Sequence, residues 1–266
     1  MPRRKYKALV LALYAVLLLS VSGFLLRLFE YRQAVSEYDQ IALAMTSTDT
    51  LAPMDTREPE ISPAMMGPTR TISPASTPAV YVSQQMRSLK AQNRDTVGYL
   101  EIVGTAIGYP VVKGRDNSYY ESHTFSKKKN ASGAIFMDST NDADLSDFNL
   151  VLYGHNMKDG SMFHELLQYR KTAFTRDHRN IVLTGLYEQK TFYVFSAYTI
   201  MKSAEIRGFK YNTAEEKQSF LNVLVKRSEI SAGSATLTAD SQIITLVTCR
   251  GNREKDFFVV HGVLVD

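Results

Sequence analysis

The apolar residues of this chain follow two different patterns. From Ala8 to Leu26 the sequence reads ALVLALYAVLLLSVSGFLL, without a single charge. As a helix, this stretch would rise roughly 28 Å and nearly match the ~30 Å hydrocarbon core of a bilayer. Beyond residue 80, apolar residues recur in short β-branched and aromatic runs separated by Gly, Asn and Asp. The pattern predicts one membrane-spanning helix followed by a mostly β domain.

The second zone contains eight predicted strands and a few helices. The strands are VGYLEIVG, AIGYPVVKG, GAIFMDS, NLVLYGH, NIVLTGL, KTFYVFSAYTI, SQIITLVTC and DFFVVHGVLV. Helical pattern is confined to residues 82–93, 162–170 and 213–230, and in the last of these Thr213 and Glu216 have the spacing of a capping box. Many short strands with few helices favour a mixed β barrel over a βαβ sheet.

The flanks of the apolar stretch indicate its orientation. Basic residues cluster within residues 1–7, and Arg27 follows the stretch directly, without a small-residue cleavage site. A cleaved signal peptide and a buried core helix both fit this pattern less well than an uncleaved anchor over residues 8–26. The positive-inside rule then predicts a cytoplasmic tail and an extracellular remainder. The mild net charge of +4 is a membrane signal more than a nucleic-acid signal, and no nucleic-acid partner is expected.

Residues 27–79 are expected to connect the anchor to the domain. Residues 27–45 carry charges of both signs between apolar residues, which is compatible with a helix continuing past the membrane surface. Six of the eight prolines then fall within residues 46–78, among Ser, Thr, Met and Ala, which is typical of an extended, mobile spacer. The compact domain is expected over residues 80–266.

Two side chains are the candidates for chemistry. Cys249, the single cysteine of the chain, ends an apolar strand and precedes the basic loop RGNREKD, where Arg250 and Arg253 would favour its thiolate form. His155 also ends an apolar strand and begins a loop rich in Gly, Asn and Asp. On these observations alone, a buried and inert cysteine remains an equal alternative. His261 alternates with apolar residues and is interpreted as structural.

Several classes of site are not supported by the sequence. No histidines or carboxylates stand at the spacing of a zinc site, and one cysteine cannot supply a thiolate cluster. A Gly-rich phosphate loop and a G-x-S-x-G elbow are also missing from the sequence. We therefore expect neither a metal nor another cofactor.

The two candidate residues lie in motifs that resemble those of sortases. The segment ITLVTC resembles the TLxTC signature that carries the sortase nucleophile, and LVLYGHNMKDGSMF resembles the loop that carries the catalytic histidine. The resemblance extends from about residue 97 to 266, and GYPVVKGRDNSYYESHTFSKKKNASGAIFMD is similar to class B members. It implies an eight-stranded sortase-type β barrel behind an N-terminal transmembrane helix.

The resemblance also implies an activity. Cys249 would attack the backbone carbonyl of a C-terminal sorting motif in an exported protein, and form a thioester. An amine of a cell-wall peptide precursor, or a pilin lysine, would then resolve the thioester, while His155 transfers protons. The enzyme would be a cysteine transpeptidase of the plasma membrane, with its catalytic domain outside the cell.

One position departs from the family. Sortases open their last strand with an arginine that stabilises the oxyanion, and alignment on VVHG places Phe257 there. A phenyl ring cannot donate a hydrogen bond to an oxyanion. Arg253, or with less support Arg250, could supply the guanidinium from the preceding loop. For substrate contacts, the resemblance indicates Asn117, Tyr153 and Thr248, although structural roles fit the first two nearly as well.

Three alternatives remain open on the sequence. Because of Phe257, the chain could be a catalytically impaired module that binds sorting peptides. A pilin-polymerising enzyme is another candidate, although residues 46–80 have no Asp-Pro-aromatic lid motif. An ordinary secreted cysteine protease fits least, because its cysteine usually precedes its histidine.

Overall fold

The domain is a closed barrel of eight strands, as the sequence predicts. A computed structural model describes residues 3–46, 83–201, 210–249 and 256–265. Around the barrel the strand order is β1-β2-β3-β4-β7-β8-β6-β5, in which β2–β3 and β4–β7 are parallel and the other pairs antiparallel. The strands are β1 (Thr96–Ile102), β2 (Gly108–Lys113), β3 (Ile135–Met137), β4 (Asn149–Gly154), β5 (Asn180–Thr184), β6 (Gln189–Ile200), β7 (Ile243–Cys249) and β8 (Phe257–Leu264).

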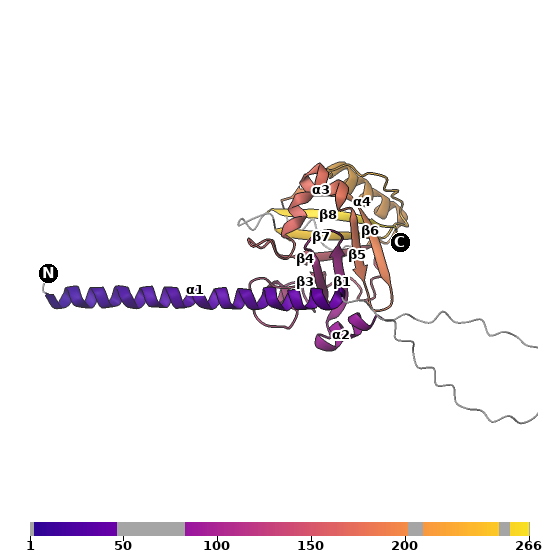
Figure 1. Cartoon of the computed structure of the whole chain (residues 1–266). Coiled ribbons are helices and arrows are strands. Elements are labelled where there is room, and N and C mark those ends of the chain that lie inside the picture. The colour runs from indigo at the N-terminus through magenta and orange to yellow at the C-terminus, as the bar shows by residue number, and fades with distance from the viewer. Residues whose placement is uncertain (1–2, 47–82, 202–209, 250–255, 266) are drawn as a thin grey trace, which may run out of the picture.

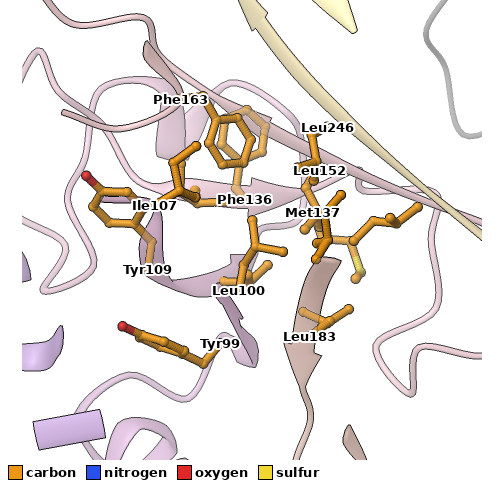
Figure 2. Packing of buried hydrophobic residues seen from close by; sticks show 14 of the residues in the cluster. Tyr99, Leu100, Ile107, Tyr109, Phe136, Met137, Leu152, Phe163, Leu183 and Leu246 are labelled. Atoms are coloured by element: carbon orange, nitrogen blue, oxygen red, sulfur yellow. The ribbon is translucent and has the colours of Figure 1, made fainter. Parts of the chain in front are cut away.

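The barrel interior is filled by large apolar side chains from most of the strands. Figure 2 shows Leu100, Phe136, Leu152, Leu183 and Leu246 packed together inside it, from β1, β3, β4, β5 and β7. All five are essentially inaccessible to solvent. Because successive strand residues point to opposite faces, residues two apart, such as Ile244 and Leu246 of β7, share this core. The core therefore fixes the register of the strand that ends at Cys249.

Helices cover the barrel from outside. The α4 helix (Ala214–Arg227) packs Leu221 and Leu224 against a second apolar cluster on the outer face of β6, β7 and β8. The predicted capping box is confirmed at its start, where Thr213 accepts from the Glu216 backbone and Glu216 accepts from the Thr213 backbone. Shorter elements are α2 (Gln84–Gln92), η1 (Tyr119–Glu121), η2 (His164–Arg170) and α3 (Thr172–Asp177).

The N-terminal helix is longer than the predicted anchor. The α1 helix runs without interruption through Arg3–Thr46, and Figure 1 shows its N-terminal part extending far to one side of the barrel. This helix is long and apolar enough to cross a membrane, and its apolar window is unburied. Its C-terminal part instead packs Ala34, Tyr38 and Ile41 against the barrel. The packed unit thus includes part of α1 as well as the barrel with the helices that cover it, while the predicted spacer over residues 47–79 lies outside the described residues.

Candidate active site

Two neighbouring parallel strands bring the histidine and the cysteine together. In the β4–β7 pairing, Tyr153 lies across from Val247 and Gly154 across from Thr248. His155 and Cys249 are the next residues after this last pair. Because the two strands run parallel, their backbones are neighbours as well. Neighbouring strands lie roughly 4.8 Å apart, so the two backbones are adjacent at this end of the barrel. Two residues separated by more than ninety positions in the sequence therefore share one edge of the sheet.

The glycine before His155 is required by close packing. A Cβ atom on Gly154 would overlap Cδ1 of Ile135 and lie 2.7 Å from the ring of Phe163, so these side chains would have to shift to admit it. The loop after His155 closes back on it, since the Phe163 backbone N–H donates to the His155 carbonyl at 2.9 Å. His155 thus begins a short loop whose backbone is fixed by this hydrogen bond.

A backbone carbonyl orients the imidazole of His155. Its Nε2 lies 2.7 Å from the carbonyl oxygen of Glu121, at the end of η1. A carbonyl oxygen can only accept, so Nε2 carries the hydrogen and donates it. In the neutral ring Nδ1 is then the basic nitrogen, which is the atom that could take up and return a proton. The side chain is partly exposed, as a proton-transfer group that must meet a substrate has to be.

Asn117 and Tyr153, the predicted substrate contacts, converge on a carboxylate that the sequence reasoning missed. Oδ2 of the buried Asp138 accepts from Nδ2 of Asn117 at 3.0 Å and from Oη of Tyr153 at 2.8 Å. Oδ1 accepts from the backbone and hydroxyl of Thr140. Burial acts to raise the pKa of Asp138, but the hydrogen bonds from Thr140, Tyr153 and Asn117 outweigh it and lower the pKa below its ordinary value. Asp138 is therefore ionised, and its hydrogen bonds fix the side chains of Asn117 and Tyr153.

Thr248, the third predicted contact, is buried beside the nucleophile position. It is 1% exposed, and among the described residues its Oγ1 has no hydrogen-bond partner. A buried hydroxyl without a partner is uncommon. A substrate contact at Thr248 stays a prediction.

The β8 strand places Phe257 directly opposite the nucleophile. In the β7–β8 pairing Cys249 lies across from Phe257, whose partly buried ring packs with the apolar cluster under α4. The departure from the family therefore falls at the residue that faces Cys249 on the neighbouring strand. Arg253 and Arg250 lie outside the described residues, so their roles stay predictions.

Another arginine lies near the start of β8. Arg170, at the end of η2, holds its guanidinium 5.3 Å from the ring centre of Phe258. It donates to Oγ1 of Thr199 at 2.6 Å and pairs with Glu229 at 3.4 Å. Since these groups engage its donors, we do not assign Arg170 to the oxyanion.

Comparisons with known proteins agree with this geometry. The profile of the sortase domain matches residues 100–265. The chain belongs to the sortase family. It is 34% identical over 191 residues to sortase B of Listeria monocytogenes, covering 69% of this chain and 75% of that protein. It is 34% identical over 170 residues to sortase B of Staphylococcus aureus, covering 64% and 69%.

Solved structures of sortase B share the fold. A structure of the Bacillus anthracis sortase B in complex with AAEK2 has a TM-score of 0.66 at 34% identity, over 71% of this chain and 86% of that one. The Staphylococcus aureus sortase B–substrate complex has a TM-score of 0.65 at 30% identity, over 70% and 87%. Among sortases the chain is therefore most similar to class B, and its family consists of cysteine transpeptidases.

Proposed function

We propose that this sortase is an active, membrane-anchored transpeptidase that attaches exported proteins to cell-wall peptide. The observation that supports the proposal is the β4–β7 register, whose last pair, Gly154 and Thr248, immediately precedes His155 and Cys249. Support comes from the similarity to class B sortases and from the apolar α1 helix. With the basic tail of residues 1–7 inside, the barrel lies outside the cell, where exported substrates and wall precursors meet it.

The proposed reaction moves one acyl group through two steps. His155 accepts the thiol proton at Nδ1, and the Cys249 sulfur attacks a backbone carbonyl of the sorting motif. The tetrahedral oxyanion collapses, the C–N bond breaks, and His155 returns the proton to the leaving amine. An incoming amine then attacks the thioester and loses a proton to His155. The C–S bond breaks, the amide product leaves, and His155 returns the proton to the Cys249 sulfur. The ring orientation imposed by Glu121 serves both directions of this proton transfer.

Arg253 is our candidate for the oxyanion donor. A guanidinium is a strong donor to a developing oxyanion, and loss of one such donor usually costs about 10²- to 10³-fold in rate. Phe257 faces the nucleophile position but cannot donate a hydrogen bond. The loop that follows Cys249 is therefore the part of the chain from which we expect the donor.

The test measures ligation of a peptide library of sorting-type sequences to a labelled cell-wall-type amine. The full chain should form amide product, Cys249→Ala should form none, and His155→Gln should lose about 10²- to 10⁴-fold. His164→Gln is the matched control, because His164 bonds Asn156 in the same loop and has no proposed proton-transfer role. Equal rates for His155→Gln and the parent would refute the role of His155.

Because Phe257 cannot donate a hydrogen bond to the oxyanion, a second candidate function is a module that binds sorting peptides without turning them over. Arg253→Ala, Arg250→Ala and Phe257→Arg separate the two. Activity that falls in Arg253→Ala and holds in Arg250→Ala supports the proposed donor. A parent chain that binds peptides but becomes active only as Phe257→Arg would establish the binding module instead.

A further inference from the structure

The C-terminal half of α1 is attached to one loop of the barrel by several hydrogen bonds. We call residues 122–133 the docking loop. Tyr38 donates from Oη to the Gly133 carbonyl at 2.7 Å, and Oη accepts from the Phe125 backbone N–H at 3.2 Å. Oε1 of Glu37 accepts from the Ser126 backbone at 2.8 Å, while Oε2 accepts from the Ser126 hydroxyl at 2.8 Å. Tyr38 is buried in this contact, so the barrel is fixed to the helix.

This attachment places the docking loop close to the end of the apolar stretch. Nδ2 of Asn130 donates to the Glu30 carbonyl at 2.7 Å. Glu30 is four residues beyond Leu26, which is roughly 6 Å along a helix. The headgroup layer on each side of the hydrocarbon core is roughly 5 to 7 Å thick. The Asn130 end of the docking loop therefore lies at the height of the headgroups, if α1 spans the membrane as proposed above. Ser126, which bonds Glu37, lies roughly 10 Å farther from the membrane.

Between these two heights, the docking loop carries basic side chains. Lys127 pairs with Asp95 at 2.8 Å. Lys128 and Lys129 are exposed, and neither forms an ion pair within the described part of the chain. On α1, the exposed Arg27 and Arg32 flank Glu30. Together with Lys128 and Lys129 they give four positive charges, against the carboxylates of Glu30 and Glu37. Such a cluster within a Debye length of a membrane is attracted to anionic lipid.

The same loop adjoins the candidate active site. Glu121, whose carbonyl orients His155, immediately precedes the docking loop. Figure 1 shows β8 running away from the N-terminal side of α1, so its start, which pairs with Cys249, is on the side of the membrane span. The end of the barrel that holds the candidate site and the basic loop thus face the same way.

We propose that Lys128 and Lys129, with Arg27 and Arg32, form a surface that contacts anionic phospholipid headgroups and turns the catalytic end of the barrel toward the bilayer. The inference rests on the membrane anchoring in the proposed function. It assigns the orientation of the domain to the docked helix and this lysine surface, not to the spacer.

The chain contains no tryptophan, so one introduced tryptophan gives a signal from one site. Three full-chain variants are reconstituted in vesicles whose lipids are brominated near the headgroup end of the acyl chains. Ala131→Trp reports the exposed docking loop, Tyr187→Trp the exposed β5–β6 turn, and Tyr14→Trp the span. In vesicles of anionic phospholipid, we expect at least twofold more quenching for Ala131→Trp than for Tyr187→Trp, and strong quenching for Tyr14→Trp.

Charge variants in the Ala131→Trp background test the lysines. Lys128→Gln with Lys129→Gln should halve the quenching in anionic vesicles and leave it unchanged in zwitterionic ones. Lys171→Gln with Lys226→Gln removes the same charge from exposed sites elsewhere and should change nothing.

Equal quenching of Ala131→Trp and Tyr187→Trp, with Tyr14→Trp quenched, would overturn the orientation and leave the anchoring intact. Unquenched Tyr14→Trp would instead overturn the anchoring itself. Quenching that ignores Lys128 and Lys129 would remove their role. A lysine-dependent emission shift with soluble polyphosphate, but none with vesicles, would assign the surface to an anionic wall polymer and overturn the lipid contact.

Discussion

His261 should make the barrel sensitive to mild acid. The ring is buried in β8, stacks on Tyr198 with centroids 5.3 Å apart, and lies with Nδ1 2.9 Å from Oγ1 of Thr245. That hydroxyl donates to Oδ1 of Asn149, so it accepts from His261, and the hydrogen is on Nδ1. Nε2 has no partner among the described residues. Burial without a charged partner lowers the pKa of His261 from 6.5 to about 3.

The direction of the effect follows from the lowered pKa. In the unfolded chain His261 takes up a proton below pH 6.5, whereas in the folded chain it stays neutral until about pH 3. The unfolded state therefore binds more protons in this window, and stability falls as the pH falls. The loss is about 2 kcal/mol between pH 7.5 and 5, and about 4 kcal/mol by pH 3, at ~1.4 kcal/mol for each pKa unit.

Urea unfolding of residues 28–266, followed by near-ultraviolet circular dichroism of the tyrosines, measures this loss at pH 7.5, 6 and 5. His261→Gln keeps a donor for Thr245 but cannot titrate, so it should lose less than about 0.5 kcal/mol between pH 7.5 and 5. His178→Gln removes a partly exposed histidine and should lose stability as the parent does. A parent whose unfolding free energy is the same at pH 7.5 and 5 would refute the reasoning.

Three further substitutions have defined outcomes. Tyr38→Phe leaves the Gly133 carbonyl and the Phe125 N–H unpaired and should cost about 2 kcal/mol in urea unfolding, whereas Tyr187→Phe in the exposed β5–β6 turn should cost nothing; equal effects would contradict the docking of α1. Asp138→Asn weakens the hydrogen bonds that hold Asn117 and Tyr153, so it should raise KM for a sorting peptide more than it lowers kcat. Steady-state kinetics measures both, and an unchanged KM would contradict a role of these two side chains in substrate binding. Thr213→Ala removes the cap of α4 and should cost about 1 kcal/mol, measured by the same unfolding experiment.

The strands were predictable because their residues carry local signals. Runs such as IITLVTC and NLVLYGH are β-branched or apolar and end at polar loops, and both became neighbouring strands. The capping box at Thr213 was readable for the same reason, since its two partners lie within one turn. Placing His155 and Cys249 at strand ends was enough to make them candidates, but only the parallel pairing of β4 with β7 puts them at the same edge.

Other features of the structure either leave no signal in the sequence or leave one that the sequence analysis did not use. The docking face of α1 has a signal, because Ala34, Tyr38 and Ile41 recur at helical spacing within a charged sequence. Asp138 also has one, as a carboxylate directly after the apolar run IFM. The carbonyl of Glu121 has none, because any residue supplies a backbone carbonyl and the contact joins positions 34 apart.

The most direct test of the central claim is the intact mass of the full chain after incubation with sorting-type peptides and no amine acceptor. We predict one added acyl group on Cys249, released by hydroxylamine as a thioester is, and greatly reduced in His155→Gln. The single cysteine makes the assignment unambiguous. A chain that binds the peptides yet never gains the acyl mass, under conditions where Phe257→Arg does, would contradict the claim that this sortase is an active transpeptidase.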